Sequence, residues 1–512
     1  MDTKVSIPAY TATPVDEIPQ ICETVRRAFR TNKTKSLEWR KVQLRKLYWA
    51  IEDYTPQLEE ALMRDLHKSK FESHVTEIDW IKNDCTYMLA NLDKFAKDKR
   101  LPPPHVPLVF QVHKIRTRPE PLGAALIIGT YNLPIQLLLV PVVGAIAAGC
   151  TAVIKPSEGA PNVAMVVKEI VEKTLDQSAF RVVNGAVPET TALLDQKWDK
   201  IFYTGSANVA RIIARKAAEN LTPMTLELGG RNPAFVTRNA DLRLAARRLL
   251  WGKTLCAGQV CLSQNYVLVE KQVADRFVEQ LNAANKEFFP NGAKASPDLC
   301  RVVNERQFLR MKKMIDQSKG RIVLGGEIDQ SELFIAPTAV LVDSIEDSVM
   351  AEESFGPIFA IMPYESLSEA IQIANTVCST PLALSVFGTR AENERILTEV
   401  TSGGATFNDG FFHAQLNNAP FGGVGESGTG AYRGKASFDT FTHFRTLAET
   451  PNWADKMLRV RYMPYDWSEI RLLRLVTERA PDFDRSGRVV KGFGYWARFV
   501  FCLGGRGAKV SD

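Results

Sequence analysis

The sequence predicts an α/β protein built on two doubly wound parallel sheets. Short apolar runs alternate with helical stretches from residue 123 onward, and the same alternation returns in the second half of the 512-residue chain. Short buried strands that alternate with helices are typical of parallel sheets with helices on both faces. A chain of this length also exceeds what one hydrophobic core holds, so we expect more than one domain.

The elements can be justified in chain order. Residues 16–100 repeat apolar residues at three- and four-residue spacing, as in IPQICETVRRAFR, and this spacing predicts helices. Residues 101–121, LPPPHVPLVFQVHKIRTRPEP, begin with prolines and continue with alternating apolar residues. That pattern indicates an exposed strand or hairpin.

The strands of the two sheets follow. GAALIIGTYNLP, TAVIKPSE, FRVVNG and KIFYTGS predict the first sheet, with a small-residue helix at PVVGAIAAG. NPAFVTR, NYVLVEK, RIVLGG and ALSVFGT predict the second sheet, and ADRFVEQLNAANKEFF and ERQFLRMKKMIDQSK predict two of its helices.

Composition excludes several classes of function. The hydrophobic fraction of 45% and the charged fraction of 24% are typical of a soluble globular protein, and the net charge of +6 is too mild to indicate a nucleic-acid partner. The eight cysteines form no C-x-x-C pair and the six histidines are dispersed, so we expect a reduced intracellular protein without a metal. MDTKVSIPAYTATP has no apolar signal core, which favours the cytoplasm.

Residues 451–512 form a basic, aromatic extension. They hold 12 Lys/Arg against 7 Asp/Glu and include Trp453, Trp467 and Trp496. Their apolar run GFGYWARFVFCLGG is interrupted by Arg498 and is shorter than the roughly 20 residues that span a membrane. Two interpretations stay open. One is an anchor at the cytosolic face of a membrane; the other is a helical lid or an oligomer contact.

A single cysteine raises the question of chemistry. GQVCLSQN, residues 258–265, contains one cysteine, Cys261, which follows a glycine and lies among small polar residues. Taken alone, this thiol fits a buried core cysteine better than a nucleophile. Cys256, five residues earlier, is interpreted as structural.

Other segments suggest ligand loops, each with a plainer alternative. YTGS ends a strand just before a helix, which suits a phosphate or a simple helix cap. VIKPSE carries Lys155 and Glu158, which suit ribose hydroxyls or a solvated turn. LELGGRNP carries Glu227, which suits a general base or a strand end before a turn.

Taken together and in this order, the segments resemble the aldehyde dehydrogenase superfamily. GTYN, IKPSE, YTGS, LELGGRNP, GQVC, EESFGP and PFGGVGESG are similar to seven of its motifs, over roughly residues 20–447. PLALSVFG, PFGGVGESGTGAYRGKASFDTFTH and the short N-terminus resemble the class 3 and fatty-aldehyde branch.

The resemblance implies specific roles. Cys261 is the nucleophile, Glu227 the general base and Asn132 the oxyanion-hole donor. The cofactor is NAD, with NADP as an alternative, because Glu158 repels a 2′-phosphate while Lys155 attracts one. The residues implied to bind the cofactor are Lys155, Glu158, Thr204, Gly205, Ser206, Glu353 and Phe355.

The same resemblance implies an architecture of two Rossmann-like domains and a β-arm oligomerisation element. The NAD-binding domain covers residues 1–102 and 120–227, and the catalytic domain covers residues 228–435. The β-arm covers residues 103–119 and 436–450, with a strand around 436–447. Such arms reach a second subunit in the family, so we expect a homodimer.

The implied reaction is NAD(P)-dependent oxidation of a lipophilic aldehyde, whether medium- or long-chain, apocarotenoid or aromatic, to the carboxylic acid. Cys261 adds to the aldehyde, hydride passes to the nicotinamide, and water activated by Glu227 hydrolyses the thioester. Two alternatives stay open: transfer of the acyl group to coenzyme A, and a catalytically retired scaffold at a membrane surface.

Some positions depart from the family pattern. Ser263 and Gln264 follow the nucleophile where the family often has a small apolar residue and proline, and we expect them to alter the substrate pocket. Arg231 and Ala210 replace a usual lysine and glycine. Asn408 and His413 are assigned no chemistry.

Overall fold

The computed structural model describes residues 5–101, 108–456, 458–470, 474, 481, 483–489 and 492. The chain divides into two compact units. The first comprises residues 1–92 and 121–442 and contains both α/β sheets. The second comprises residues 93–120 and 443–512.

The first sheet is doubly wound. Its central strand is β3, from which the chain moves outward through β4 and β5 on one side and through β6 and β7 on the other. All of these pairings are parallel, and the short β17 adds an antiparallel edge to β7. The strands are β3 (Ala124–Ile128), β4 (Thr151–Lys155), β5 (Phe180–Val182), β6 (Lys200–Thr204), β7 (Met224–Glu227) and β17 (Gly428–Thr429).

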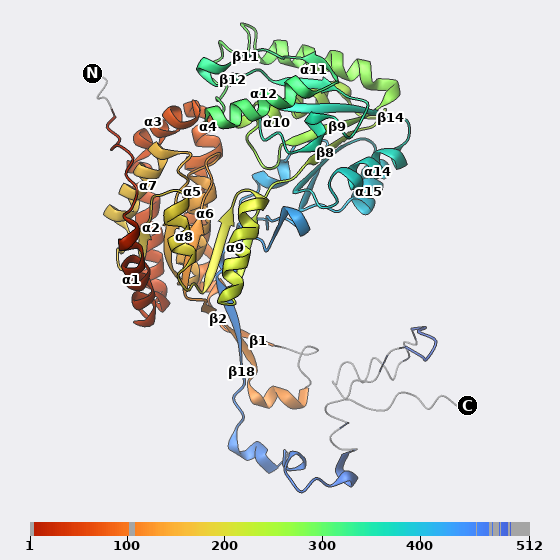
Figure 1. The fold of residues 1–512 in the computed structure, drawn as a ribbon. Coiled ribbons are helices and arrows are strands. Elements are labelled where there is room, and N and C mark those ends of the chain that lie inside the picture. Colours follow the sequence, from red (N-terminus) through yellow and green to blue (C-terminus); the bar gives the residue numbers. More distant parts are fainter. Residues whose placement is uncertain are drawn as a thin grey trace. The chain divides into compact units, whose positions relative to one another are not determined.

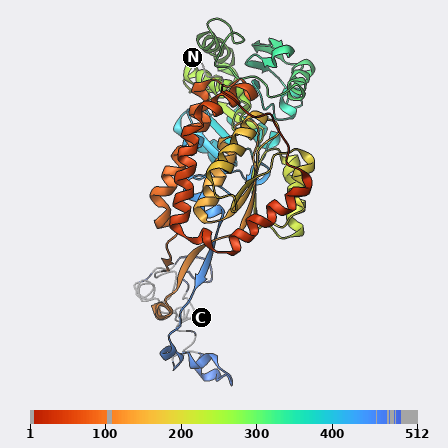
Figure 2. The same cartoon turned by 90° about the vertical axis from the view of Figure 1, so that its left-hand side faces the viewer.

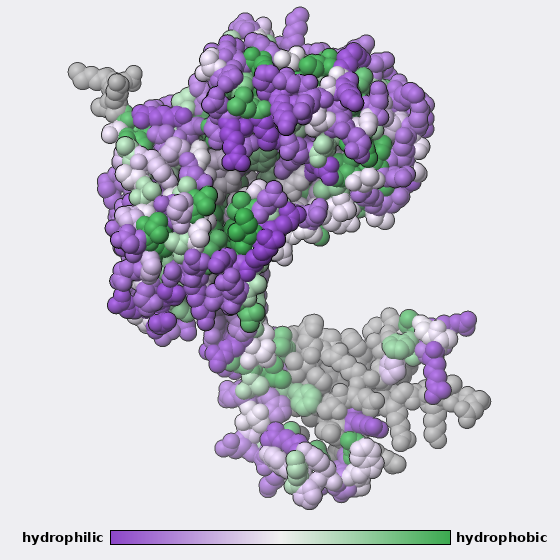
Figure 3. Space-filling model, viewed as in Figure 1, coloured by the Kyte–Doolittle hydropathy of each residue, from purple (hydrophilic) through white to green (hydrophobic). Residues whose placement is uncertain are grey.

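Helices cover both faces of this sheet. Every residue of β3, β4 and β6 is buried, as expected when both faces are covered. Figures 1 and 2 show the N-terminal helices side by side over one of its faces. Figure 3 shows mainly hydrophilic side chains on the visible outer face of this unit. The helices are α1 (Ile18–Arg30), α2 (Leu37–Asp53), α3 (Thr55–Leu66), α4 (Lys70–Ser73), α5 (Asp79–Phe95), α6 (Gln136–Ala148), α7 (Pro161–Thr174), α8 (Val187–Leu194) and α9 (Ala207–Glu219).

Helix α6 is apolar on every side because it is buried on every side. It ends at Gly149, whose φ of 91° is the left-handed conformation that a glycine cap adopts readily. A π-helical turn, His74–Ile78, joins α4 to α5.

The second sheet has the order β10-β13-β14-β9-β8-β15-β16 and is parallel except at β10. Its β9 residues alternate between two cores: Tyr266 and Leu268 face one, and Val267 and Val269 the other. The strands are β8 (Asn232–Val236), β9 (Gln264–Glu270), β10 (Arg321–Leu324), β13 (Thr338–Leu341), β14 (Ile358–Tyr364), β15 (Ala383–Phe387) and β16 (Gly404–Phe407). A small hairpin joins β11 (Ile328–Asp329) to β12 (Phe334–Ile335).

Six helices cover the second sheet (Figure 1). They are α10 (Leu242–Thr254), α11 (Ala274–Phe288), α12 (Glu305–Gln317), α13 (Ser348–Ala351), α14 (Leu367–Val377) and α15 (Arg390–Glu399). The predicted fold class of two doubly wound α/β sheets is thus confirmed.

The predicted strand around residues 436–447 is wrong in its first half. Residues Lys435–Thr440 form the helix α16, and only Thr442–Leu447 form a strand, β18. Helix α16 packs on α6, where Gly144 lets the backbones approach: a Cβ there would lie 2.7 Å from the Ser437 carbonyl oxygen. The segment from 436 to 442 therefore belongs to the first unit, and the β-arm boundary at 436 lies too early.

The second unit contains a three-stranded sheet of order β1-β2-β18. Strands β1 (Lys99–Arg100) and β2 (Arg116–Pro121) pair antiparallel. Residues 93–102, expected in the NAD-binding domain, fall in this unit because β1 pairs with β2. Within the predicted arm segment 103–119, Leu108–His113 is a 3₁₀ helix, and residues 103–107 lie outside the described chain.

The extension after residue 450 is described in part. It contains short 3₁₀ turns at Asn452–Lys456, Arg459–Arg461 and Trp467–Glu469. The run GFGYWARFVFCLGG lies outside the described residues except for Gly492. Within the described part of the chain, every helix is too short or too polar to cross a membrane.

The placement of α16 predicts a stability difference between two phenylalanines. Phe438 is 1% exposed, whereas Phe407 on β16 is 38% exposed. We expect Phe438→Ala to lower the free energy of unfolding by about 3–5 kcal/mol, because it leaves a cavity under α16. Phe407→Ala should cost less than about 1 kcal/mol. Urea unfolding followed by circular dichroism measures both, and equal losses would contradict the packing of α16.

Candidate active site

The carboxyl ends of the first sheet's strands gather polar side chains at one edge. Parallel pairing sets Thr204 at the end of β6 directly beside Glu227 at the end of β7. The segment that carries Asn132 leaves the end of β3, the strand between β6 and β4. This edge is where parallel α/β sheets place their ligands.

A cavity of about 440 Å³, here called the polar cavity, opens at this edge. It brings together eight of the ten predicted site residues, and Lys155 and Glu158 are the two that do not line it. The eight are Asn132, Thr204, Gly205, Ser206, Glu227, Cys261, Glu353 and Phe355.

Cys261 is half-buried in the loop between α10 and β9. Burial raises the pKa of its thiol to about 12, the Glu353 and Glu227 carboxylates add to the rise, and the Arg433 guanidinium opposes it. The thiol is therefore neutral at physiological pH in this state. Its use as a nucleophile needs a base that removes the proton as the bond forms.

Glu227 is the candidate for that base, because it lines the same cavity as Cys261. It is buried, and neither carboxylate oxygen has a hydrogen-bond partner. Burial raises its pKa well above the usual value, and Arg433 opposes the rise. A buried carboxylate that lacks partners accepts a proton readily at neutral pH, as a general base requires.

Asn132 joins this edge to the loop of the nucleophile. Its side-chain Nδ2 donates to the Gln259 carbonyl at 2.8 Å, and its buried Oδ1 has no partner. A primary amide carries two N–H donors, so one remains for a ligand. Asn132 can therefore act as an oxyanion donor while it stays fixed to the chain two residues before Cys261.

The turn from β6 into α9 suits a phosphate. Ser206 caps α9, with its hydroxyl 3.4 Å from the Val209 amide, and the helix N-terminus faces the polar cavity. The buried Thr204 hydroxyl has no partner in the protein. Since buried polar groups are normally paired, this hydroxyl points to a ligand.

Glu353 and Phe355 line the same cavity from the second sheet's side. A Cβ at Gly229 would lie 2.5 Å from Glu353 Oε1, so the glycine lets this carboxylate lie close to the Gly229 backbone. Burial raises the pKa of Glu353 to about 7. Phe355 meets Tyr131 edge-to-face at 5.9 Å. Arg310 of α12 donates to the Glu353 carbonyl at 3.0 Å and fixes this turn.

These groups together fit a dinucleotide of the NAD(P) type: an unpartnered hydroxyl and a helix N-terminus for phosphate, and a carboxylate with an aromatic ring for a ribose and a nicotinamide. Lys155 and Glu158 lie at the end of β4, outside the polar cavity, where Lys155 Nζ and Glu158 Oε2 form an ion pair at 2.7 Å. Lys155 is buried, whereas Glu158 is exposed enough to meet a ligand.

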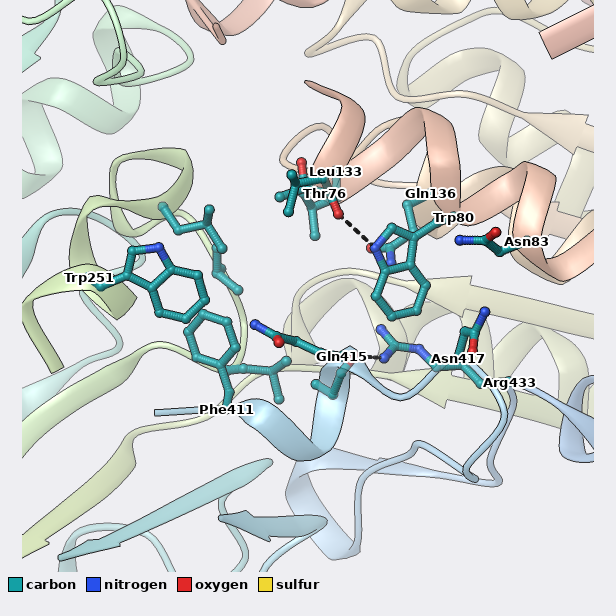
Figure 4. Close-up of a pocket in the computed structure, with 15 residues that line it drawn as sticks. Thr76, Trp80, Asn83, Leu133, Gln136, Trp251, Phe411, Gln415, Asn417 and Arg433 are labelled. Atoms are coloured by element: carbon teal, nitrogen blue, oxygen red, sulfur yellow. Dashed lines mark hydrogen bonds between the residues drawn. The ribbon is translucent and has the colours of Figure 1, made fainter. Parts of the chain in front are cut away.

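A second cavity, of about 380 Å³ and here called the aromatic cavity, lies beside the first. Leu133 lines it next to Asn132, and Val260 and Leu262 line it on either side of Cys261. Figure 4 shows Trp251 and Phe411 on one wall and Trp80 with Arg433 on the other. The first pair stacks at 5.3 Å, and the Arg433 guanidinium lies 4.7 Å from the Trp80 ring.

The expectation that Ser263 and Gln264 shape the substrate pocket is wrong. Both are buried and line neither cavity. The Ser263 hydroxyl donates to the Gly252 carbonyl at 2.8 Å, and the Gln264 amide donates to the Leu249 carbonyl at 2.7 Å. These two hydrogen bonds tie the start of β9 to α10.

Sequence reasoning missed the residues that build the aromatic cavity. Arg433 lies in a glycine-rich segment as an ordinary charged residue, and Trp80, Trp251 and Phe411 occur in apolar patterns as core residues. His413, which was assigned no chemistry, lines neither cavity; its Nδ1 lies 2.7 Å from the Thr406 hydroxyl, and burial lowers its pKa to about 4.

Comparison with known proteins gives one consistent result. Residues 2–447 match the model of the aldehyde dehydrogenase family. The chain is 61% identical, over 99% of its length and 94% of the relative's, to a β-apo-4′-carotenal oxygenase of Neurospora crassa. It is 41% identical to human aldehyde dehydrogenase family 3 member B1, over 91% and 98% of the two chains. Among solved structures, substrate-bound AldH of Staphylococcus aureus has a TM-score of 0.82 and 37% identity, over 87% and 98% of the chains.

The charge of Arg433 predicts the reactivity of Cys261. Arg433→Gln removes the guanidinium charge that lowers the pKa of this thiol. The rate of alkylation by iodoacetamide follows the thiolate fraction, so we expect it to fall about three- to tenfold at constant pH. Arg433→Lys retains the charge and should alkylate within about twofold of the native rate. Equal rates for all three proteins would contradict this role.

Proposed function

The chain belongs to the aldehyde dehydrogenase family, and we propose that it oxidises long, conjugated apolar aldehydes of the apocarotenal type to carboxylic acids. The observation that carries the proposal is the junction of the two cavities at Cys261. Cys261, Glu227 and Asn132 line the polar cavity, while chain neighbours of Cys261 and Asn132 line the aromatic cavity.

The aromatic cavity supports the choice of substrate. Its lining includes Trp80, Trp251 and Phe411, whose flat faces suit a planar polyene, together with aliphatic side chains and several polar ones. A short hydrophilic aldehyde would leave most of this surface wet. The N. crassa relative is named for an apocarotenal, and its 61% identity makes the same class the first to test here.

The chemistry starts with proton transfer inside the polar cavity. The Glu227 carboxylate takes the proton of the Cys261 thiol, and the sulfur forms a bond to the aldehyde carbon. The carbonyl oxygen becomes an oxyanion, which the free N–H of the Asn132 amide stabilises. Preorganised donors of this kind contribute about 10²–10³ in rate. Bound NAD(P)⁺ supplies the acceptor for the hydride that the tetrahedral carbon releases.

The second half of the reaction uses the same residues in new roles. Glu227 first releases the thiol proton to solvent and is a carboxylate again. Water then attacks the thioester on Cys261, and Glu227 accepts the water proton. The C–S bond breaks, the acid leaves, and the thiol is restored. Asn132 again stabilises the oxyanion. We favour water over coenzyme A as acceptor because the unpartnered Glu227 is the base that hydrolysis requires.

For the cofactor we propose NAD⁺ in preference to NADP⁺. The Glu158 carboxylate repels a 2′-phosphate and can accept hydrogen bonds from ribose hydroxyls. Its ion pair with Lys155 uses the nearest cation, so that cation is less available to a phosphate.

We also propose that the protein is a homodimer that contacts a membrane peripherally at its cytosolic face. Strand β18 is an edge of its sheet and exposes most of its residues, and such an edge is a template for pairing with a second copy. The extension exposes Trp453, Tyr465 and Trp467 together with Arg459 and Arg461. Aromatic and basic side chains of this kind favour a lipid headgroup region.

Steady-state and acyl-enzyme measurements test the reaction. We expect kcat/KM to be higher for an apocarotenal than for short alkanals, and Cys261→Ser to abolish cofactor reduction. Glu227→Gln should lower kcat by about 10²–10⁴-fold, because it removes the base of both halves of the reaction. The acyl adduct that this variant forms slowly should persist in the intact mass, because its hydrolysis also lacks a base. Activity retained by Cys261→Ser would refute the proposed mechanism, in which Cys261 is the nucleophile. Formation of acyl-CoA when coenzyme A is added would favour the alternative in which the acyl group passes to coenzyme A.

Vesicle binding tests the extension. We expect the full chain to co-sediment with phosphatidylcholine–phosphatidylserine vesicles. Deletion of residues 451–512 should weaken binding about tenfold or more, as should Trp453→Ser with Tyr465→Ser and Trp467→Ser. The deleted chain should stay dimeric by light scattering because it retains β18. Unchanged vesicle binding by the deleted chain would leave the lid or oligomer contact as the role of the extension.

A further inference from the structure

A fully buried ion pair lies behind the active site. Lys68 follows α3, and Glu77 lies in the π-helical turn before α5. Their side chains have no exposed surface, and Lys68 Nζ is 2.5 Å from Glu77 Oε1. Burying two charges is costly unless their remaining hydrogen bonds are satisfied. The partners that satisfy them are therefore informative.

Both ends of the pair bind the turn that carries Asn132. Lys68 Nζ donates to the Asn132 carbonyl at 3.2 Å. The other oxygen of Glu77 accepts the backbone N–H groups of Ile135 at 2.9 Å and Gln136 at 3.1 Å, at the start of α6. The ion pair thus fixes the backbone at the carbonyl of Asn132 and at the start of α6 just after it.

A second carboxylate binds the loop of the nucleophile. Glu72 accepts the backbone N–H of Cys256 at 2.7 Å and the thiol of Cys300 at 3.5 Å. Cys256 and Ala257 both have a left-handed φ of 50°, a strained turn for residues with side chains. The Cys256 thiol donates to the Asn132 carbonyl at 3.2 Å, so this loop shares its acceptor with Lys68.

The cluster has the residue types of a metal site, since the ligand atoms of Glu72, Cys256 and Cys300 lie within 4.8 Å of one another. Lys68 argues against a metal. Its ammonium binds the same carbonyl oxygen as the Cys256 thiol, so it already supplies positive charge where a cation would bind. Although burial acts in the opposite direction, Cys256, Glu77 and Glu72 raise the pKa of Lys68 and keep it charged.

We propose that Lys68, Glu72 and Glu77, here called the buried ion cluster, hold the Asn132 amide and the Cys261 loop in register for oxyanion binding. Lys68 is a positioning residue, because it contacts the backbone of Asn132 and neither cavity. The proposal rests on the proposed function, in which Asn132 stabilises the oxyanion at Cys261.

A double-mutant cycle tests whether Lys68 acts through Asn132. Lys68→Met keeps an apolar stem of similar length and removes the donor. We expect it to lower kcat about 10- to 100-fold with little change in KM, since a misplaced donor costs rate and not substrate binding. In an Asn132→Ala background, the same substitution should lower kcat less than about twofold, because the amide it positions is gone. Multiplicative losses would overturn the proposal.

Cofactor-free acyl transfer gives a second readout. Release of p-nitrophenolate from p-nitrophenyl acetate needs Cys261 and an oxyanion donor but no cofactor, and it should fall in parallel with kcat in Lys68→Met. Aldehyde oxidation absent in the native protein while this release persists would count against the proposed function alone. Release unaffected by Lys68→Met would count against the buried ion cluster alone.

Cys256 supplies a matched pair of variants if Lys68→Met does not fold. Cys256→Ser keeps a donor to the Asn132 carbonyl, and Cys256→Ala removes it. We expect release to fall about two- to fivefold in Cys256→Ala and to remain within about twofold in Cys256→Ser, at equal thermal midpoints. Equal rates in both would overturn the proposal, as would a stoichiometric metal ion in the purified native protein.

Discussion

The parallel pairing of β3, β6 and β7 is the constraint on which the site depends. A parallel register brings strand ends to one edge, so Thr204 and Glu227 become neighbours although they are 23 positions apart in the sequence. The chain then leaves β3 toward Asn132 at that same edge. Cys261 and Glu353 come from the second sheet, and they meet the first group in the polar cavity. Without this register, Glu227, Asn132 and the turn between β6 and α9 would not line the same cavity.

Burial acts differently on the carboxylates of this edge because their partners differ. Glu77 has Lys68 and two backbone N–H groups, so its charge is matched and its role is to hold the chain. Glu227 has no hydrogen-bond partner, so burial leaves it ready to take a proton. The two glutamates are the same residue type, and their hydrogen-bond partners decide which one is reactive and which one is structural. This division explains how one short region contains both a reactive and a rigid set of acids.

The sequence predicted what local pattern encodes. The strands and helices of both sheets follow apolar periodicity, and the residues of the polar cavity lie in short motifs near strand ends. Contacts between residues that lie far apart in the sequence could not be predicted from local pattern. KASFDTF, from residue 435, was interpreted as the start of a strand, yet it is a helix because the close approach at Gly144 lets it pack on α6. Lys68 looks like a solvated helix end until its partner Glu77 and the carbonyl of Asn132 are in place. Ser263 and Gln264 look like pocket residues only because they follow Cys261 in number.

The late strand β17 has a consequence for how the protein is made. Gly428 pairs with Glu227 across the edge of the first sheet, and α16 covers α6 soon afterward. The first sheet and its apolar helix are therefore completed by residues that leave the ribosome some 200 positions after β7. Until then the nascent chain carries an open sheet edge and an uncovered apolar helix, both of which invite misassociation. An active molecule can therefore first exist only after the last fifth of the chain has been translated. Chaperones must shield these surfaces until then.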